Sequence, residues 1–267
     1  MQGSLSENDT LPFYPNNSLQ SKNRKIWISQ SNHSIGRMGK EGFRSYAFSE
    51  STSAQELQIA EDPEGGIWVL SPLDGLFQYN QSSDSFVKRL NVSGGRSLLI
   101  HDDHLLLGND ALYVYLLTED GLRLERTIPM EEDLVTALHV DQNNEFFAGT
   151  QKGKLYHLKD LETEPRTIYG ANEAHRVEEL DFKQINEIYV TYDAEGRNDK
   201  LWVSSASGLW LLQQQFFKTV EDLPMNNPIG IAIGAQERAW VPMNYLYQIS
   251  REEDDFRAKP IFDNMQV

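Results

Sequence analysis

The chain has 267 residues, no cysteine and a formal net charge of −16, because 24 lysines and arginines stand against 40 aspartates and glutamates. Without cysteine it can form no disulfide, no thiolate nucleophile and no cysteine-ligated zinc or iron–sulfur centre. The negative charge opposes a phosphate backbone, so we expect no nucleic-acid partner. No apolar run reaches the roughly 18 residues of a membrane span, and the polar first thirty residues do not resemble a signal peptide, which leaves the compartment open.

A short apolar run recurs along the chain at nearly regular intervals. The centres of its six copies are Trp27, Trp68, Leu106, Phe147, Trp202 and Trp240. The spacings between these centres are 41, 38, 41, 55 and 38 residues, close to the period of about 40–50 residues that is typical of a β-propeller blade. The longest interval predicts an insertion in one blade.

Each copy brings the same neighbouring segments, which the second copy illustrates. A β-prone segment at Leu57–Ala60 precedes the run at Ile67–Val69, and Leu76–Tyr79 and the more polar Phe86–Leu90 follow it. Four strands in about 40 residues, graded from apolar to polar, describe one propeller blade. No segment with helical periodicity competes with this interpretation.

We therefore predict an all-β fold, a β-propeller of about six four-stranded blades that forms a single domain over residues 1–267. Residues 1–16 are expected to be an N-terminal extension and residues 170–184 an insertion between blades. The innermost strand of the first blade has to come from residues 17–21, and its pairing would close the ring at six blades and leave no open edge. The alternative is that the chain is a piece of a larger propeller.

The tryptophans are expected to be packing residues. Trp27, Trp68, Trp202 and Trp240 occupy the same place in four blades. A ligand-binding residue normally occurs once, whereas a residue that packs one sheet against the next recurs in every repeat. Trp210, on a third strand, is expected in the core as well.

The motifs of several blades resemble a known repeat. Gly66–Val69 with Asp74–Tyr79, Phe147–Thr150 and Leu223–Asn226 are similar to the two-component-regulator propeller repeat, and the resemblance extends over roughly residues 25–261. The Trp-Asp pair of WD40 blades is absent. The match departs at His101–His104, where the glycine-bearing turn is replaced.

This resemblance implies the extracytoplasmic sensor propeller of bacterial sensor kinases and hybrid regulators, especially those that respond to glycans. Similar propellers serve as secretion or assembly factors at the cell envelope, and the repeat relates loosely to the streptogramin-lyase propellers. Because propellers carry many functions, the resemblance implies the fold more strongly than the activity.

We predict no catalytic residues, no metal site and no cofactor. The cluster His101–His104 is expected to be a solvated turn, because a tight turn points adjacent side chains in different directions. The acidic turns at Asp62, Asp141 and Asp193 lack the carboxylate spacing of a calcium loop, and their side chains are expected to bond their own backbone.

Candidate ligand-binding residues lie on the loops that join the second strand to the third within a blade, and on those that join one blade to the next. These loops open on one face of a propeller, called here the loop face, where a pocket is expected. Their side chains are amides, carboxylates, an arginine and a tyrosine, which suit a sugar or another polar ligand. The candidates are His33, Asp74, Arg96, Asn109, Asp110, Gln151, Lys152, Asn226, Asn244 and Tyr245.

The sequence therefore predicts a non-catalytic sensing propeller of a bacterial envelope signalling system, which is periplasmic or in the cell envelope and recognises a glycan or another polar ligand. One alternative is an envelope scaffold, an assembly or secretion-associated propeller that binds other proteins. A weaker alternative is a lyase-type propeller enzyme. An apolar cluster on a blade rim would favour the scaffold.

Overall fold

The computed structural model describes most of the chain. The described residues are 15–30, 33–40, 42–48, 56–131, 133–169, 183–192, 198–213, 216–219, 231–234, 238–242, 246–252 and 255–260. The regular secondary structure in these ranges consists of strands alone. No helix long and apolar enough to cross a membrane is found among them. The predicted insertion at 170–184 lies almost wholly outside the described residues.

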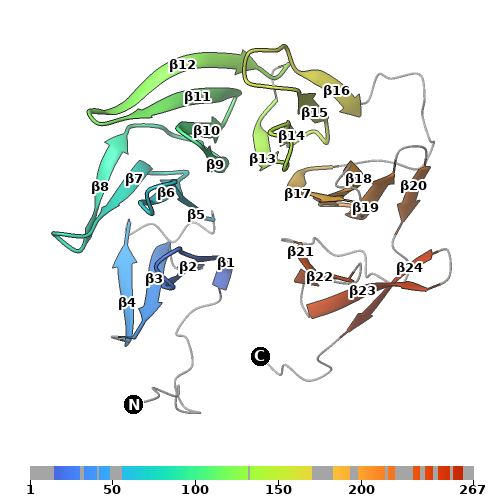
Figure 1. Cartoon of the computed structure of the whole chain (residues 1–267), viewed down its shortest axis with the longest axis horizontal. Coiled ribbons are helices and arrows are strands. Elements are labelled where there is room, and N and C mark those ends of the chain that lie inside the picture. The colour runs from blue at the N-terminus through green and yellow to red at the C-terminus, as the bar shows by residue number, and fades with distance from the viewer. Residues whose placement is uncertain are drawn as a thin grey trace. The chain divides into compact units, whose positions relative to one another are not determined.

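The described residues form twenty-four strands in six four-stranded antiparallel sheets, numbered here as blades 1 to 6 in chain order (Figure 1). Blade 1 holds β1 (Pro15–Gln20), β2 (Ile26–Gln30), β3 (Ser34–Gly39) and β4 (Gly42–Ala47), and blade 2 holds β5 (Gln58–Glu61), β6 (Ile67–Ser71), β7 (Gly75–Asn80) and β8 (Ser85–Leu90). Blade 3 holds β9 (Ser97–His101), β10 (His104–Gly108), β11 (Ala111–Thr118) and β12 (Gly121–Pro129), and blade 4 holds β13 (Val135–Val140), β14 (Phe146–Thr150), β15 (Leu155–Leu158) and β16 (Arg166–Tyr169). Blade 5 holds β17 (Ile185–Tyr192), β18 (Asn198–Ser205), β19 (Gly208–Gln213) and β20 (Phe216–Thr219), and blade 6 holds β21 (Ala232–Gly234), β22 (Arg238–Pro242), β23 (Leu246–Glu252) and β24 (Asp255–Pro260).

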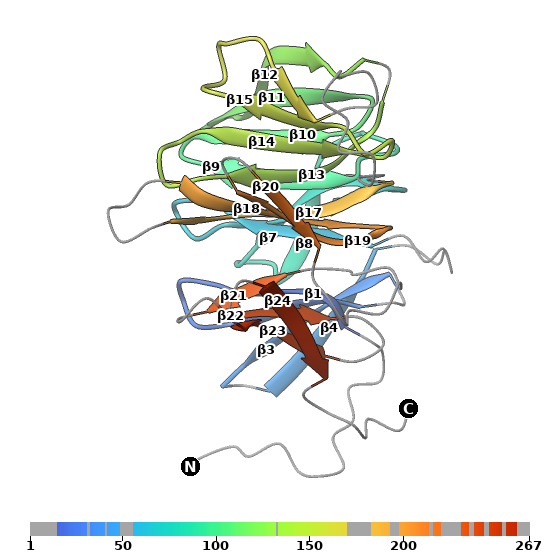
Figure 2. The same cartoon turned by 90° about the vertical axis from the view of Figure 1, so that its right-hand side faces the viewer.

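The predicted fold class is confirmed: the chain is an all-β propeller of six four-stranded blades. In every blade each strand pairs with the next along the chain, as the neighbouring strands of blade 6 show in Figure 2. The N-terminal stretch forms the innermost strand of blade 1, as predicted, because Leu19 of β1 pairs with Trp27 of β2. The blades fall into two compact units. The first unit comprises residues 1–109 and 113–127, and the second comprises residues 110–112 and 128–267.

In the first unit the core lies between consecutive blades. Trp27 and Ile35 of blade 1 pack with Ile67 and Val69 of blade 2 in one buried cluster. Trp68, on the other face of the same blade 2 strand, packs with residues of blade 3 such as Leu105 in the next. Because side chains alternate across a strand, neighbouring positions on β6 serve two different cores.

The second unit repeats this arrangement. Phe147 of blade 4 and Trp210 of blade 5 belong to one buried cluster, and Trp202 of blade 5 packs with Val241 and Tyr247 of blade 6 in another. The packing role predicted for Trp27, Trp68, Trp202 and Trp210 is thus confirmed.

One five-residue turn joins the first two strands of several blades. In blade 2 Asp62 accepts hydrogen bonds from Glu64 N at 3.0 Å and Gly66 N at 2.7 Å, and its other oxygen accepts one from Trp68 Nε1 at 2.8 Å. In blade 4 Asp141 accepts bonds from its own turn in the same way, at 2.8 Å from Glu145 N. The acidic turns at Asp62 and Asp141 therefore bond their own backbone, as predicted, whereas Asp193 lies outside the described residues.

Loss of the Asp62 carboxylate should destabilise the fold. Asp62→Ala leaves a buried indole N–H and two turn amides without their acceptor, so we expect the free energy of unfolding to fall by about 2–3 kcal/mol. In the background of Trp68→Phe, which lacks the indole donor, the same change should cost about 1 kcal/mol less. Chemical denaturation of the four members of this double-mutant cycle measures the difference. Equal costs in both backgrounds would contradict the role of the Asp62–Trp68 bond.

Candidate functional site

The structure brings two of the loop-face candidates, His33 and Asp74, together across blades 1 and 2. His33 Nε2 lies 3.0 Å from Ser71 Oγ and 3.2 Å from Asp74 Oδ2, and Ser71 Oγ donates to Asp74 Oδ2 at 2.8 Å. The His33 side chain is fully buried, whereas that of Asp74 is 24% exposed. His33 thus holds Asp74 in place, and it is Asp74 that a ligand from solvent would meet. Leu73, on the same turn, is also exposed.

Arg96 and Asn109 flank the connection between blades 2 and 3. Arg96 N donates to Gly108 O at 2.8 Å, and Asn109 Nδ2 donates to Ser93 O at 3.1 Å. Asp110, the next candidate, is an exposed residue immediately before β11. Asn109 therefore fixes the neighbouring loop with its side chain, and Arg96 does so with its backbone.

A second fixed loop, in blade 4, carries Gln151 and Lys152. Asp133, which is 3% exposed, accepts hydrogen bonds from Leu134 N at 2.8 Å and from Lys152 N at 3.1 Å. Gln151 N donates to Leu134 O at 2.9 Å. The side chains of Gln151 and Lys152 are exposed above this anchored backbone. The remaining candidates, Asn226, Asn244 and Tyr245, lie outside the described residues.

The cluster His101–His104 forms the turn between β9 and β10, as expected, with Asp102 and Asp103 exposed and the two histidines partly exposed. His104 lies between two carboxylates, with Nδ1 2.8 Å from Asp103 Oδ1 and Nε2 3.2 Å from Glu125 Oε2. His101 pairs instead with Asp102, whose side chain is 78% exposed. The described residues contain no group of three or more His, Asp or Glu side chains placed to hold a metal ion.

Two titratable residues with shifted pKa values lie on innermost strands of the second unit, and of these Glu187 was not found from the sequence. Burial raises the pKa of Glu187, on β17, to about 7, although a hydrogen bond from Ile231 N opposes that shift. Burial lowers the pKa of His139, on β13, to about 4, against the nearby charge of Asp141. His139 Nε2 accepts a bond from Val190 N at 3.4 Å. Both side chains thus bond the backbone of the next blade.

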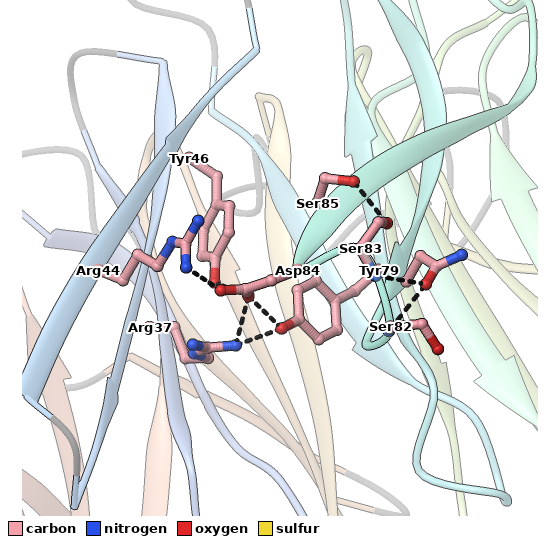
Figure 3. Close-up of polar contacts among 9 residues, drawn as sticks. Arg37, Arg44, Tyr46, Tyr79, Ser82, Ser83, Asp84 and Ser85 are labelled. Carbon is pink, nitrogen blue, oxygen red and sulfur yellow. Dashed lines mark hydrogen bonds and ion pairs between the residues drawn. The ribbon is translucent and has the colours of Figure 1, made fainter.

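A polar cluster near the outer edge of blades 1 and 2 also escaped the sequence analysis (Figure 3). Asp84, on the turn between β7 and β8, accepts hydrogen bonds from Tyr46 at 2.7 Å and from Tyr79, and it pairs with Arg37 at 2.9 Å and with Arg44. The two hydroxyls, followed by the two guanidinium groups, hold the pKa of Asp84 well below its ordinary value. Hydrogen bonds and ion pairs thus favour the charged form of the carboxylate.

Arg37 is at the same time enclosed by aromatic rings. Its guanidinium lies 5.8 Å from the ring centre of Trp27, 5.7 Å from that of Tyr46 and 5.5 Å from that of Tyr79. A cation within about 6 Å of a ring centre is attracted by the ring quadrupole. Arg37 is thus fixed by one carboxylate and three rings.

Beside this cluster, at the end of blade 1 opposite to the loop face, lies a cavity of about 600 Å³, called here the basic cavity. Three segments of blade 1 and the turn of Asp84 line it. The lining residues are Asn23, Arg24, Lys25, Arg37, Gly39, Lys40, Gly42, Phe43, Arg44 and Asp84.

Comparison with protein-family models found no match, and comparison with curated proteins found none either. Among solved structures, the extracellular domain of the hybrid two-component system BT3049 from B. thetaiotaomicron is similar, with a TM-score of 0.72 and 16% identity over 96% of this chain and 35% of that one. The corresponding domain of BT4673 from the same organism has a TM-score of 0.71 and 14% identity over 96% of this chain and 34% of that one. Virginiamycin B lyase from Staphylococcus aureus has a TM-score of 0.66 and 12% identity over 95% of this chain and 85% of the lyase.

These likenesses establish the fold. The chain resembles the extracellular domains of two-component systems, as the sequence motifs implied, and it spans about a third of the length of the two such chains. The lyase shares the propeller architecture over nearly its whole length.

The raised pKa of Glu187 makes stability depend on pH. Its pKa in the folded chain, about 7, lies above the ordinary 4.5, so the folded state holds this proton more tightly than the unfolded state. The stabilisation is complete below the unfolded value and is lost as the pH rises through 7. Glu187→Gln removes the titration, so at pH 8 the variant should be more stable than the wild type by about 2–3 kcal/mol, and near pH 4 the two should be nearly equal. Urea denaturation at both pH values measures the gap. A gap that does not change with pH would contradict the assignment.

Proposed function

We propose that this chain is the ligand-sensing propeller of an extracytoplasmic signalling protein, and that it binds a glycan or another polar ligand on its loop face without carrying out chemistry. The proposal rests on one observation: buried side chains fix the loop-face turns of blades 2 and 4, and polar side chains that are at least partly exposed stand on those two turns.

Two turns show this arrangement in different units. In blade 2, Ser71 and the buried His33 hold Asp74. In blade 4, the buried Asp133 accepts from the backbone N–H of Lys152, whose own side chain is exposed. A binding surface that is ordered before the ligand arrives loses less conformational entropy on binding. Such turns suit recognition of hydroxyl and amide groups, which needs fixed donors and acceptors.

The comparisons support the signalling context. Both two-component proteins of similar fold are described as extracellular domains, which supports the proposal that this chain lies outside the cytoplasm. The chain spans about a third of each, so transmission of a signal would depend on parts of a longer protein.

The scaffold alternative expects an apolar cluster on a blade rim. Among the described residues, the exposed large hydrophobic residues of the outermost strands are Phe43, Val87, Leu124 and Ile168. They belong to β4, β8, β12 and β16, so blades 1 to 4 contribute one each. Hydrophobic residues scattered singly are ordinary on protein surfaces. This distribution favours the sensor over the scaffold.

A thermal-shift panel of neutral oligosaccharides tests the proposed function. A ligand at about 100 times its dissociation constant adds about 2.7 kcal/mol of stability, so at least one member should raise the melting temperature clearly. A ligand bound at the turn of blade 2 should lose the shift in Asp74→Ala, and a ligand bound at the turn of blade 4 should lose it in Lys152→Ala, because these changes remove the polar groups that reach solvent on those turns. Lys159→Ala, an exposed lysine on the connection after β15, serves as the control and should keep the shift.

No shift with any member, or a shift that survives both loop-face changes, would overturn the proposal. Breakdown of an added oligosaccharide by the wild-type protein would instead favour an enzyme.

A further inference from the structure

We propose that the basic cavity of blade 1 is a second binding site, for a small organic molecule that carries at least two phosphate or sulfate groups. The cavity lies at the opposite end of the blade from the loop face, and the proposal does not depend on the proposed function.

The first argument is the local charge. Five lining residues are cationic, Arg24, Lys25, Arg37, Lys40 and Arg44, and one, Asp84, is anionic, so the described lining carries 5 − 1 = +4. The whole chain carries −16. Glu41, next to Lys40 in the sequence, lies outside the described residues and is not counted. A concave surface of opposite sign to the rest of the molecule attracts and concentrates anions.

The second argument is that Asp84 leaves most of these cations without a counter-charge. Asp84 pairs with Arg37 and Arg44. The side chains of Arg24, Lys25 and Lys40 make no ion pair with a carboxylate among the described residues. Three cations that line one cavity, with no ion pair in the described part of the chain, are available to an anion from solution.

The third argument comes from the repeat itself. The same five-residue turn precedes the second strand in blades 1, 2 and 4, with a backbone N–H of the fourth residue bonded to the carbonyl of the first in each. The fourth residue has a positive φ: 87° for Gly65 in blade 2, 62° for Asn144 in blade 4, and 61° for Arg24 in blade 1. Glycine and asparagine tolerate this left-handed backbone, whereas arginine is disfavoured there.

The amino-acid composition of this turn also distinguishes blade 1 from blades 2 and 4. It reads Asp-Pro-Glu-Gly-Gly in blade 2 and Asp-Gln-Asn-Asn-Glu in blade 4, but Ser-Lys-Asn-Arg-Lys in blade 1. Blade 1 therefore replaces two acids with three bases and accepts a strained backbone at Arg24. Strain at a position that neighbouring repeats fill without strain points to a role beyond folding.

The turn is also held firmly in place. Lys22 N donates to both oxygens of Glu61 in blade 2, at 2.9 and 3.0 Å, and Lys22 Nζ donates to Pro63 O at 2.7 Å. On the far side of the cavity Arg37 is fixed among Trp27, Tyr46 and Tyr79. The cations therefore stand on an ordered frame, which favours a compact ligand.

The ring of Phe43 offers an apolar contact for the organic part of the ligand. Its side chain is 40% exposed and lines the cavity. A Cβ added to Gly36 would lie 2.5 Å from Phe43 Cε2, so the ring rests directly on the glycine backbone. A volume of about 600 Å³ is in the range of small-molecule sites. The cavity thus offers cations for the charged groups and one ring for an apolar face.

Isothermal titration at fixed ionic strength tests the proposal, with fructose 1,6-bisphosphate and sucrose octasulfate as the organic probes and inorganic pyrophosphate as the bare anion. We expect the wild type to bind at least one organic probe, and binding to weaken as salt screens the charges. The double variant Arg24→Asn with Lys25→Glu gives blade 1 the two residues that blade 4 uses in this turn. It should lower the affinity at least about tenfold, and should melt no lower than the wild type, because asparagine suits the backbone of residue 24.

The control is Lys159→Glu with Arg123→Asn, which removes the same three units of positive charge at exposed positions outside the cavity and should leave the affinity unchanged. Phe43→Ala should weaken the organic probes and not pyrophosphate. If the double variant folds poorly, Lys40→Gln replaces it, with a smaller expected loss.

Absence of binding by all three probes, or equal losses in the double variant and the control, would overturn the proposal. Phosphate and sulfate esters are distinguished by which organic probe binds more tightly. Neutral oligosaccharides play no part in this experiment, so its failure is separate from failure of the proposed function.

Discussion

Within each compact unit a sheet covers its apolar face with the neighbouring sheet, because the described part contains no helix to pack on it. This constraint explains why the repeat is visible in the sequence at all. The second strand of each blade must be apolar on both faces, and it supplies Trp27, Trp68 and Trp202 to cores that lie between consecutive blades. The outermost strands have less to cover and can be polar.

The same packing brings together polar side chains that are far apart along the chain. Neighbouring blades are joined at their inner strands by Glu187 and Ile231, at the loop face by His33 and Asp74, and at the outer edge by Arg37 and Asp84. Each of these links lets a side chain of one blade satisfy the backbone or a side chain of the next. Hydrogen bonds that are satisfied in this way fix the loops on which both proposed sites depend.

The strands, the blade number and the packing role of Trp27, Trp68, Trp202 and Trp210 could be predicted from the sequence because they follow from local alternation and from a period near 40 residues. Even β1, a polar stretch, was found because a blade that starts at Trp27 lacks an inner strand without it. The cluster of Arg37, Tyr79 and Asp84 could not be found in this way. Arg37 lies more than 40 residues from Tyr79 and Asp84 along the chain, and a sequence pattern gives the place of a residue along its strand and not its partner on the next blade.

Local signals for the second site were nevertheless present. The turn of residues 21–25 is basic where the corresponding turns are acidic, and an alignment of the blades with one another shows this difference. The unusual backbone of this turn could be recognised only in the structure, because a positive φ at Arg24 cannot be predicted from composition. The loop-face candidates show the converse case. Their position was predictable, but the burial of His33 behind Asp74 depends on the contact between two blades.

Amide hydrogen exchange along the blades tests most directly whether packing of sheet against sheet holds this fold together. If it does, amides of the second strands β2, β6, β10 and β14, whose side chains are buried on both faces, should exchange most slowly in their blades. Amides of the outermost strands β4, β8 and β12, which are largely exposed, should exchange fastest. Equal protection of second and outermost strands would contradict the account, because it would mean that the stability of a blade does not come from the sheets that cover it.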